Sequence, residues 1–189
     1  MSHIIGLVGY SNSGKGTYCY FVRKMFGIPS LTTGDIVRAE VKRRGLEVTA
    51  HNISKVSDEI RKEVNHCFME VAKPYLKDLT STHKIIVVDS LRELVDKEVL
   101  REYTPTLKTV GIYADLEVRY NRALLRRREG DSLTLEGFLN LEDKERYLGT
   151  DELLKVVDAN IINNGDLSYF YKKSIKTTKK LMGEFESNV

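Results

Sequence analysis

The chain of 189 residues has no tryptophan, three prolines and two cysteines, and it lacks any long apolar run. A helix that spans a bilayer needs about 20 consecutive, mainly apolar residues, so no membrane segment is predicted. Cys19 and Cys67 do not have the spacing of a zinc site or a disulfide framework. An apolar segment begins almost at residue 1, which leaves no room for a signal peptide. Free thiols are typical of a reducing compartment, and we expect a cytoplasmic protein.

The charges are nearly balanced, with 30 Lys and Arg against 27 Asp and Glu. A net charge of +3 does not indicate a polyanionic partner. Five lysines between residues 172 and 180 are best explained as a solvated helix face, because no aromatic stacking surface accompanies them. We therefore expect neither a nucleic-acid nor a membrane partner, and the oligomeric state stays open.

The most informative segment is Gly9–Thr17, which reads GYSNSGKGT. It follows the apolar run Ile4–Val8 and precedes a segment with helical spacing, which is the context of a phosphate-binding P-loop. Glycines let the backbone wrap closely around phosphate oxygens, and the loop N–H groups and the helix N-terminus then face the anion. Lys15 is expected to reach the outer phosphates of ATP, and the Thr17 hydroxyl to bind Mg²⁺. The predicted ATP-binding residues are Gly9, Asn12, Ser13, Gly14, Lys15, Gly16 and Thr17.

Short apolar segments alternate with helical segments along the chain, without repeats or a linker. The alternation predicts one α/β domain over residues 1–189, with the P-loop NTPase fold and a five-stranded parallel sheet flanked by helices on both faces. A helical region is expected from about 51 to 79, with a break or kink near Pro74. The last helix is expected to bury an apolar row formed by Leu167, Tyr171, Ile175, Thr178 and Met182.

Asp89 ends the second clear apolar strand pattern, over residues 83–88. Parallel strands place their carboxyl ends at one edge of a sheet, so Asp89 and the Gly9–Thr17 loop can meet there. A carboxylate at this point is what a P-loop site needs as a second contact for Mg²⁺, usually through water. The alternative is an aspartate that caps the next helix. With the P-loop present, the metal role is favoured.

Three motifs resemble those of nucleoside monophosphate kinases, adenylate kinase most of all. Residues 14–17 read GKGT, residues 33–39 look like the TGDxxRA segment, and residues 88–92 are similar to the DGFPR turn, one residue shorter. The whole chain resembles the small P-loop proteins known as adenylate-kinase-related. The resemblance implies transfer of the γ-phosphoryl group of ATP·Mg²⁺ to a small nucleotide, most simply a nucleoside monophosphate. It also implies acceptor-binding helices at about 32–79 and a short lid at about 129–133.

The resemblance assigns roles to individual residues. Thr33, Arg38 and Arg92 would bind the acceptor, and Arg122 and Arg126 would act with Lys15 on the transferring group. Beyond the lid, where adenylate kinases carry further arginines, this chain offers only Arg146.

The interval from Arg92 to the adenine-reading Gln of adenylate kinase leads here to Asp96. An ionised Asp can accept hydrogen bonds from guanine N1–H and N2–H₂ but leaves adenine N1 without a donor. If Asp96 lines the acceptor pocket, AMP should not be strongly preferred over GMP. The alternative is an exposed Asp96, with the base read by backbone groups.

Two other functions stay open. Residues 158–165 are similar to the AD-x-x-I-x-N-x-G turn of dephospho-coenzyme A kinases, which makes that activity an alternative. A nucleotide-binding switch or slow ATPase that acts through a partner is a second alternative. The switch predicts an exposed apolar patch and no acceptor pocket. The kinase predicts a basic acceptor pocket built from Arg38 and Arg92.

Overall fold

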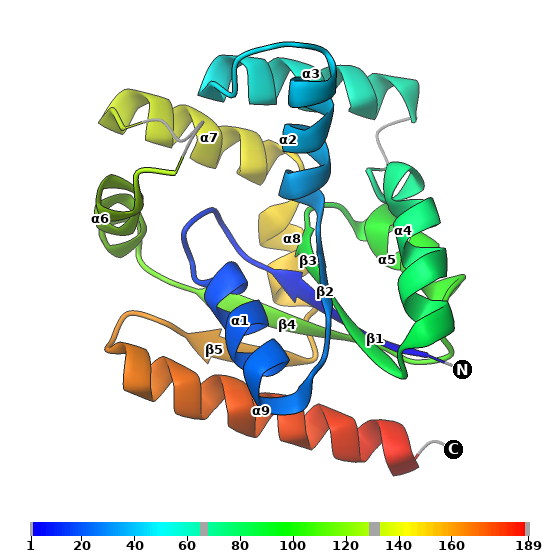
Figure 1. Cartoon of the computed structure of the whole chain (residues 1–189). Coiled ribbons are helices and arrows are strands. Elements are labelled where there is room, and N and C mark those ends of the chain that lie inside the picture. Colours follow the sequence, from blue (N-terminus) through cyan, green and yellow to red (C-terminus); the bar gives the residue numbers. More distant parts are fainter. Residues whose placement is uncertain (1, 65–67, 129–132, 188–189) are drawn as a thin grey trace.

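The computed structural model describes residues 2–64, 68–128 and 133–187 (Figure 1). Its sheet has five strands, all of them parallel, in the order β2-β3-β1-β4-β5. The strands are β1 (His3–Val8), β2 (Ser30–Thr32), β3 (Ile85–Leu91), β4 (Leu107–Tyr113) and β5 (Ala159–Ile162). The predicted five-stranded parallel sheet is thus confirmed.

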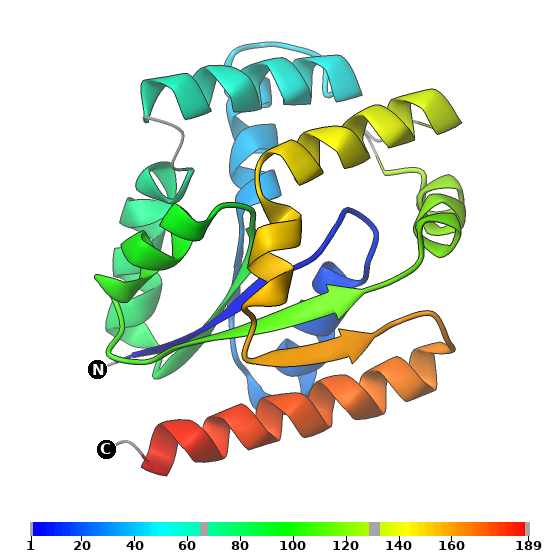
Figure 2. The ribbon, with the colours of Figure 1, turned by 180° about the vertical axis from the view of Figure 1, so that it is seen from behind.

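The two faces of the sheet are covered by separate sets of helices (Figures 1 and 2). On one face, Ile5 and Leu7 of β1 pack in a core with α1 (Lys15–Phe26) and α9 (Leu167–Ser187). On the other face, Ile4 and Val8 pack with α4 (Met69–Thr82), α5 (Leu94–Arg101) and α8 (Thr150–Lys155). Alternate residues of β1 therefore enter two cores, as its uninterrupted apolar sequence requires. Within the described residues, no helix combines the length and the apolar character of a membrane span.

Four more helices stand beyond the carboxyl ends of the strands, where the phosphate loop emerges (Figure 1). They are α2 (Thr33–Arg43), α3 (Ala50–Glu63), α6 (Leu116–Arg126) and α7 (Leu135–Tyr147). Val37 and Val41 of α2 form a third core with Val56 and Ile60 of α3. These helices surround the space above the loop. Most of the predicted lid at 129–133 lies outside the described residues, which resume at Leu133.

The helical region predicted for 51–79 is two helices, and of the break or kink expected near Pro74 the break does not occur. α3 ends at Glu63, α4 begins at Met69, and Pro74 lies inside α4. The division falls where the chain leaves the core shared with α2 and returns to the sheet, against which Met69 of α4 is fully buried.

The buried row of α9 also differs from the predicted one. It consists of Phe170, Ser174, Thr178, Leu181 and Phe185. Of the predicted row, Thr178 is buried as expected and Tyr171, Ile175 and Met182 are partly buried against the same core, whereas Leu167 is 64% exposed. Two hydroxyl residues can lie in this row because each donates to a carbonyl of its own helix. Ser174 Oγ lies 2.8 Å from Phe170 O, and Thr178 Oγ1 lies 2.9 Å from Ser174 O. The prediction selected the row with fewer Ser and Thr residues, and apart from Thr178 this row lies next to the buried one.

The contact between α1 and α9 yields a first prediction. Tyr18 and Thr178 are fully buried, and their hydroxyl oxygens lie 2.7 Å apart. Because Thr178 donates to Ser174 O, Tyr18 must be the donor to Thr178. Tyr18→Phe removes one bond and should destabilise the fold by about 0.5–1.5 kcal/mol, whereas Thr178→Val leaves a buried donor unmet and should cost about 1–3 kcal/mol. Urea unfolding of both variants measures the two losses of unfolding free energy. A larger loss in Tyr18→Phe than in Thr178→Val would contradict the prediction.

Candidate active site

The phosphate loop joins β1 to α1 through backbone angles that need glycine. Gly9 has φ 152° and Gly14 has φ 115°, in the region that other residues rarely adopt. A Cβ at Gly9 would lie 2.5 Å from Ile112 O, and a Cβ at Gly14 would lie 2.3 Å from Asn163 Nδ2. Substitution at either position would therefore force the loop away from its neighbours β4 and β5.

The first turn of α1 suits an anion. Gly14 is its N-cap, and among the described residues no side chain caps this end; the first turn also carries no acidic residue. Gly16 is exposed, and a Cβ there would meet nothing within 4 Å. N–H groups at a helix N-terminus are otherwise unpaired and carry positive partial charge. The residues present therefore fit the phosphates of a nucleotide.

We expected Lys15 to extend into the open site, but its ammonium group is bonded to the phosphate loop itself. Lys15 is buried, and its Nζ donates to Gly9 O at 2.7 Å and to Tyr10 O at 3.1 Å. Burial lowers the pKa of Lys15, against the opposing attraction of Asp89 and Glu145. To reach an outer phosphate, the ammonium group must exchange these two carbonyls for phosphate oxygens.

The two predicted Mg²⁺ ligands lie on the same cavity. Thr17 is in the first turn of α1, and Asp89 is 4% exposed near the carboxyl end of β3. Asp89 does not cap the next helix, because the N-cap of α5 is Glu93. Ser90 Oγ donates to Asp89 Oδ1 at 2.9 Å and orients the carboxylate. A hydroxyl and a carboxylate are the hard oxygen ligands that Mg²⁺ uses together with phosphate oxygens, so this donor set fits the ion.

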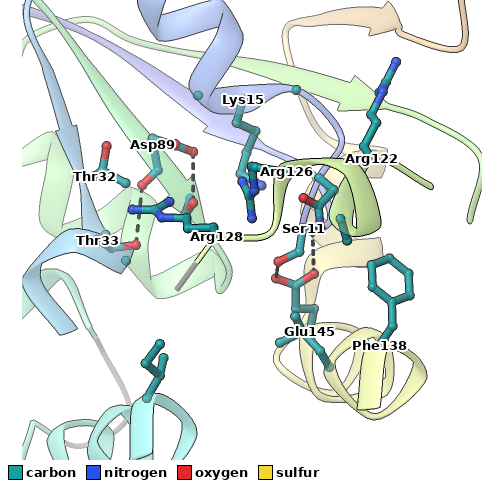
Figure 3. A pocket seen from close by; sticks show the side chains of 18 of the residues that line it. Ser11, Lys15, Thr32, Thr33, Asp89, Arg122, Arg126, Arg128, Phe138 and Glu145 are labelled. Atoms are coloured by element: carbon teal, nitrogen blue, oxygen red, sulfur yellow. Dashed lines mark hydrogen bonds between the residues drawn. The ribbon is translucent and has the colours of Figure 1, made fainter. Parts of the chain in front are cut away.

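A cavity of about 1280 Å³ opens above the loop (Figure 3). It brings together residues from the loop, α2, the end of β3 and α6. The predicted site residues that line it are Asn12, Gly14, Lys15, Gly16, Thr17, Thr33, Arg38, Asp89, Arg92, Arg122 and Arg126. Ser13 is 1% exposed and lies with Gly9 in the inner part of the loop.

The predicted acceptor residues enter from two sides. Arg38 Nη1 donates to Gly34 O at 3.1 Å and lies 3.8 Å from Asp35 Oδ1. Thr33 Oγ1 lies 3.5 Å from Asp89 O, which joins the start of α2 to the end of β3. Arg92 comes from the turn after β3 and forms an ion pair with Glu145. The arginines of the two acceptor motifs thus share one cavity with the phosphate loop.

Asp96 is not among the described residues that line this cavity, and the prediction for it is wrong in both forms. Asp96 is 1% exposed, so it is not a surface residue either. Its Oδ2 accepts hydrogen bonds from Arg92 N at 2.9 Å and Glu93 N at 3.1 Å in the capping box of α5. The shortened turn after Asp89 brings this position to the start of the helix, where a carboxylate satisfies backbone N–H groups.

Arg122 is held on the side of the loop that faces β5, and it points away from Lys15 in Figure 3. Its Nη2 donates to Asn163 O at 2.8 Å, and its Nη1 lies 3.5 Å from Ser13 O. Burial lowers the pKa of the Arg122 guanidinium. Asn163 Nδ2 in turn donates to Ser13 O at 2.7 Å. Arg122 therefore supports the outer wall of the loop in this structure, and Arg126, one turn later, lines the cavity.

Two residues of the site had no role in the sequence-based prediction. Asn163 falls within the turn motif at 158–165, and Glu145 carries no motif of its own. Glu145 accepts hydrogen bonds from Ser11 N at 2.7 Å and Ser11 Oγ at 2.8 Å, drawn as dashed lines in Figure 3. Burial pushes the pKa of Glu145 upward, but Arg92, Lys15 and the Ser11 hydrogen bonds outweigh burial and hold it below its ordinary value. No local motif predicts this contact, because 134 residues separate its two partners.

Comparison with solved structures places the fold among small-molecule kinases. A shikimate kinase from Acinetobacter baumannii aligns with a TM-score of 0.60 and 13% identity, over 97% of this chain and 94% of that one. A gluconokinase from Sinorhizobium meliloti aligns with a TM-score of 0.61 and 16% identity, over 99% of this chain and 97% of that one. At such identities the likeness concerns the fold alone.

Comparison with sequences identifies the relatives. A family model described as an AAA domain matches residues 8–137. A UPF0200 protein of Pyrococcus abyssi is 31% identical over 95% of this chain and 97% of its own length. A UPF0200/UPF0201 protein of Archaeoglobus fulgidus is 31% identical over 98% of this chain, which spans 58% of that longer protein. The resemblance to adenylate kinase thus holds at the level of a P-loop kinase-like domain. On this similarity, the chain belongs to the UPF0200 family and carries the AAA domain of the matching model.

Proposed function

We propose that this protein transfers the γ-phosphoryl group of ATP·Mg²⁺ to a small nucleotide, with a nucleoside monophosphate as the acceptor. One observation carries the proposal: Lys15 and the loop share a single cavity with Arg38 and Arg92, the arginines of the two acceptor motifs. The cavity of about 1280 Å³ exceeds the roughly 300–1,000 Å³ of a pocket for one small ligand. It therefore has room for a donor and an acceptor together.

The reaction needs no covalent intermediate with the protein. An oxygen of the acceptor phosphate forms a bond to the γ-phosphorus while the bond from that phosphorus to the β–γ bridging oxygen breaks. ADP leaves with the electron pair of the broken bond. Catalysis of such a transfer is mainly positioning and neutralisation of charge.

Each part of the chain contributes a separate task. The loop N–H groups and Lys15 would hold the β- and γ-phosphates, and Thr17 and Asp89 would hold Mg²⁺, which would supply positive charge to offset that of the phosphates. Arg38 and Arg92 would hold the acceptor phosphate, and Arg126 would approach the transferring group from α6. Arg122 keeps the loop in shape through Ser13 and Asn163, which suits a supporting role better than a clamp.

Both alternatives have less support. The residues that resemble dephospho-coenzyme A kinase include Asn163, which is bonded to the phosphate loop and Arg122 on the donor side of the cavity. The similarity therefore says nothing about the acceptor. A switch without an acceptor does not account for a cavity into which Arg38 and Arg92 converge. The switch also predicts an exposed apolar patch. Large exposed apolar side chains such as Leu125 do occur, but Leu125 belongs to the cavity wall.

A panel of acceptors is the direct test. We expect MgATP to be consumed in step with a nucleoside monophosphate, and much faster than without an acceptor. AMP, GMP, CMP, UMP and dephospho-coenzyme A should be compared by kcat/KM in a coupled assay of ADP formation. ADP release at one slow rate, whatever acceptor is added, would contradict the proposal and favour the ATPase.

Lys15→Met should lower kcat by about a hundredfold or more, which is the loss typical of removing one donor to a transition-state oxyanion. The melting temperature should change little, because within the described residues the Lys15 ammonium group donates only to two loop carbonyls. Turnover and thermal melting are measured on the same preparation. Near-normal turnover in the variant would exclude the loop from the chemistry.

Arg38→Ala should raise the Kd or KM of the acceptor by at least about tenfold, because a hydrogen bond to a charged group contributes about 1.5–3 kcal/mol. The affinity for MgATP should barely change. Arg43→Ala is the matched control, because Arg43 lies on the same helix but is exposed and outside the cavity. Equal loss of both ligands in calorimetry, or an equal effect in the control, would remove Arg38 from the acceptor site.

A further inference from the structure

Glu145 joins the two sides of the cavity. Through Ser11 it contacts the phosphate loop, and through its ion pair with Arg92 it contacts the acceptor side. The same oxygen, Oε1, accepts from Ser11 Oγ and from Arg92 Nη1, while Oε2 accepts from Ser11 N. One carboxylate therefore orients a loop amide, a loop hydroxyl and a guanidinium at the same time.

The helix that carries Glu145 is itself firmly held. Glu142, one turn earlier on α7, is buried and accepts from Arg119 Nη2 of α6 at 2.8 Å. The loop residue Tyr10 donates to Asp151 of α8, the helix that follows α7, at 2.7 Å. The Glu145 side chain is only 2% exposed. Its position is therefore set by protein contacts and not by solvent.

Arg92 keeps donors available for a ligand. A guanidinium has five N–H groups in a rigid fork, and Glu145 is the partner of Nη1. Arg92 and Glu145 both line the cavity, and their side chains are 21% and 2% exposed, respectively. The carboxylate contacts one arm of the guanidinium and thereby sets the direction in which the fork points.

We propose that Glu145 is a positioning residue: it holds the phosphate loop and Arg92 as one unit, so that the donor and acceptor phosphates meet at a fixed separation. This inference rests on the proposed function. The charge of the carboxylate is balanced by Arg92 before a substrate arrives, so the bridge adds order to the cavity without adding net charge. A misplacement of about 1 Å between reacting groups can lower a rate by about a hundredfold.

The same geometry permits the opposite role, in which Glu145 competes with the acceptor phosphate for Arg92. The two roles predict opposite effects of neutralising the carboxylate. With a competing carboxylate, its removal tightens acceptor binding and raises turnover. With a positioning carboxylate, its removal lowers turnover.

The test compares Glu145→Gln with Asp158→Asn, using MgATP with AMP or GMP as acceptor probes. Gln keeps the volume of Glu145 but places an amide NH₂ against a donor, either Ser11 N–H or Arg92. We expect kcat to fall by about a hundredfold in Glu145→Gln, with a smaller change in KM. Asp158 is a matched control, because its carboxylate also accepts from a backbone N–H and a hydroxyl, both of Thr109, but lies outside the cavity lining. Asp158→Asn should lower the melting temperature and leave kcat within about threefold.

A double-mutant cycle separates positioning from general destabilisation. Arg92→Lys keeps a positive charge beside Glu145 but removes the planar fork. If Glu145 acts through Arg92, adding Glu145→Gln to Arg92→Lys should cost less than about fivefold, because contacting residues are not additive. Fully additive losses, an unchanged kcat or a faster Glu145→Gln enzyme would overturn the proposal. Glu145→Asp, which keeps the charge, replaces Glu145→Gln if the latter does not fold.

Hydrogen exchange of the Ser11 amide in the free protein gives a readout that needs no acceptor. Exchange should be faster in Glu145→Gln than in Asp158→Asn, and equal rates would overturn the proposal. If the wild-type protein phosphorylates none of the acceptors, the proposed function fails by itself, and the exchange result still decides whether Glu145 organises the loop.

Discussion

The site depends on one constraint: β1 must be paired along both edges and covered on both faces before its carboxyl end can present a loop. β1 pairs in parallel with β3 and β4, and its residues after His3 are buried. Every other strand then ends at the same edge. The loop follows β1, Asp89 lies near the end of β3 and Arg122 lies on the helix after β4, and all three reach one cavity. An antiparallel neighbour would have sent its following segment to the far edge.

Local signals were sufficient to predict the parts of the fold that are determined locally. Three features could be predicted because their physical cause lies within a few residues of each. They are the uninterrupted apolar sequence of β1, the glycines at 9 and 14, and the carboxylate near the end of β3. The contact between Glu145 and Ser11 spans 134 positions and has no periodic signal. Asp96 was misplaced because a turn one residue shorter changes the register of the helix after it. In α9, Ser174 and Thr178 can be buried because their hydroxyl groups donate to carbonyls of the same helix, and hydropathy alone does not reveal such hydrogen bonds.

Positive charge in the cavity is arranged in advance by acidic residues from other elements. Arg92 pairs with Glu145 of α7, Arg128 with Asp35 of α2, and Lys144 Nζ lies 2.7 Å from Asp58 Oδ1 of α3. These pairs join segments that are far apart in the sequence. They hold the cationic groups in defined directions, and groups that are already oriented need little reorganisation when an anion arrives. The phosphate loop differs from these pairs, because within the described residues no side chain caps the N-terminus of α1, and its N–H groups are available to phosphate.

The contact between the two ends of the described chain bears on how the protein is made. The ring of His3, at the start of β1, stacks on Phe185 of α9 with a centroid distance of 4.5 Å. Phe21 and Val22 of α1 lie in the core that α9 completes. A chain emerging from the ribosome in sequence order must therefore carry the apolar face of α1 uncovered until α9 has been synthesised. The phosphate loop also gains the contact between Ser13 and Asn163 only after a further 150 residues have been synthesised, and the uncovered apolar face is open to aggregation during that interval.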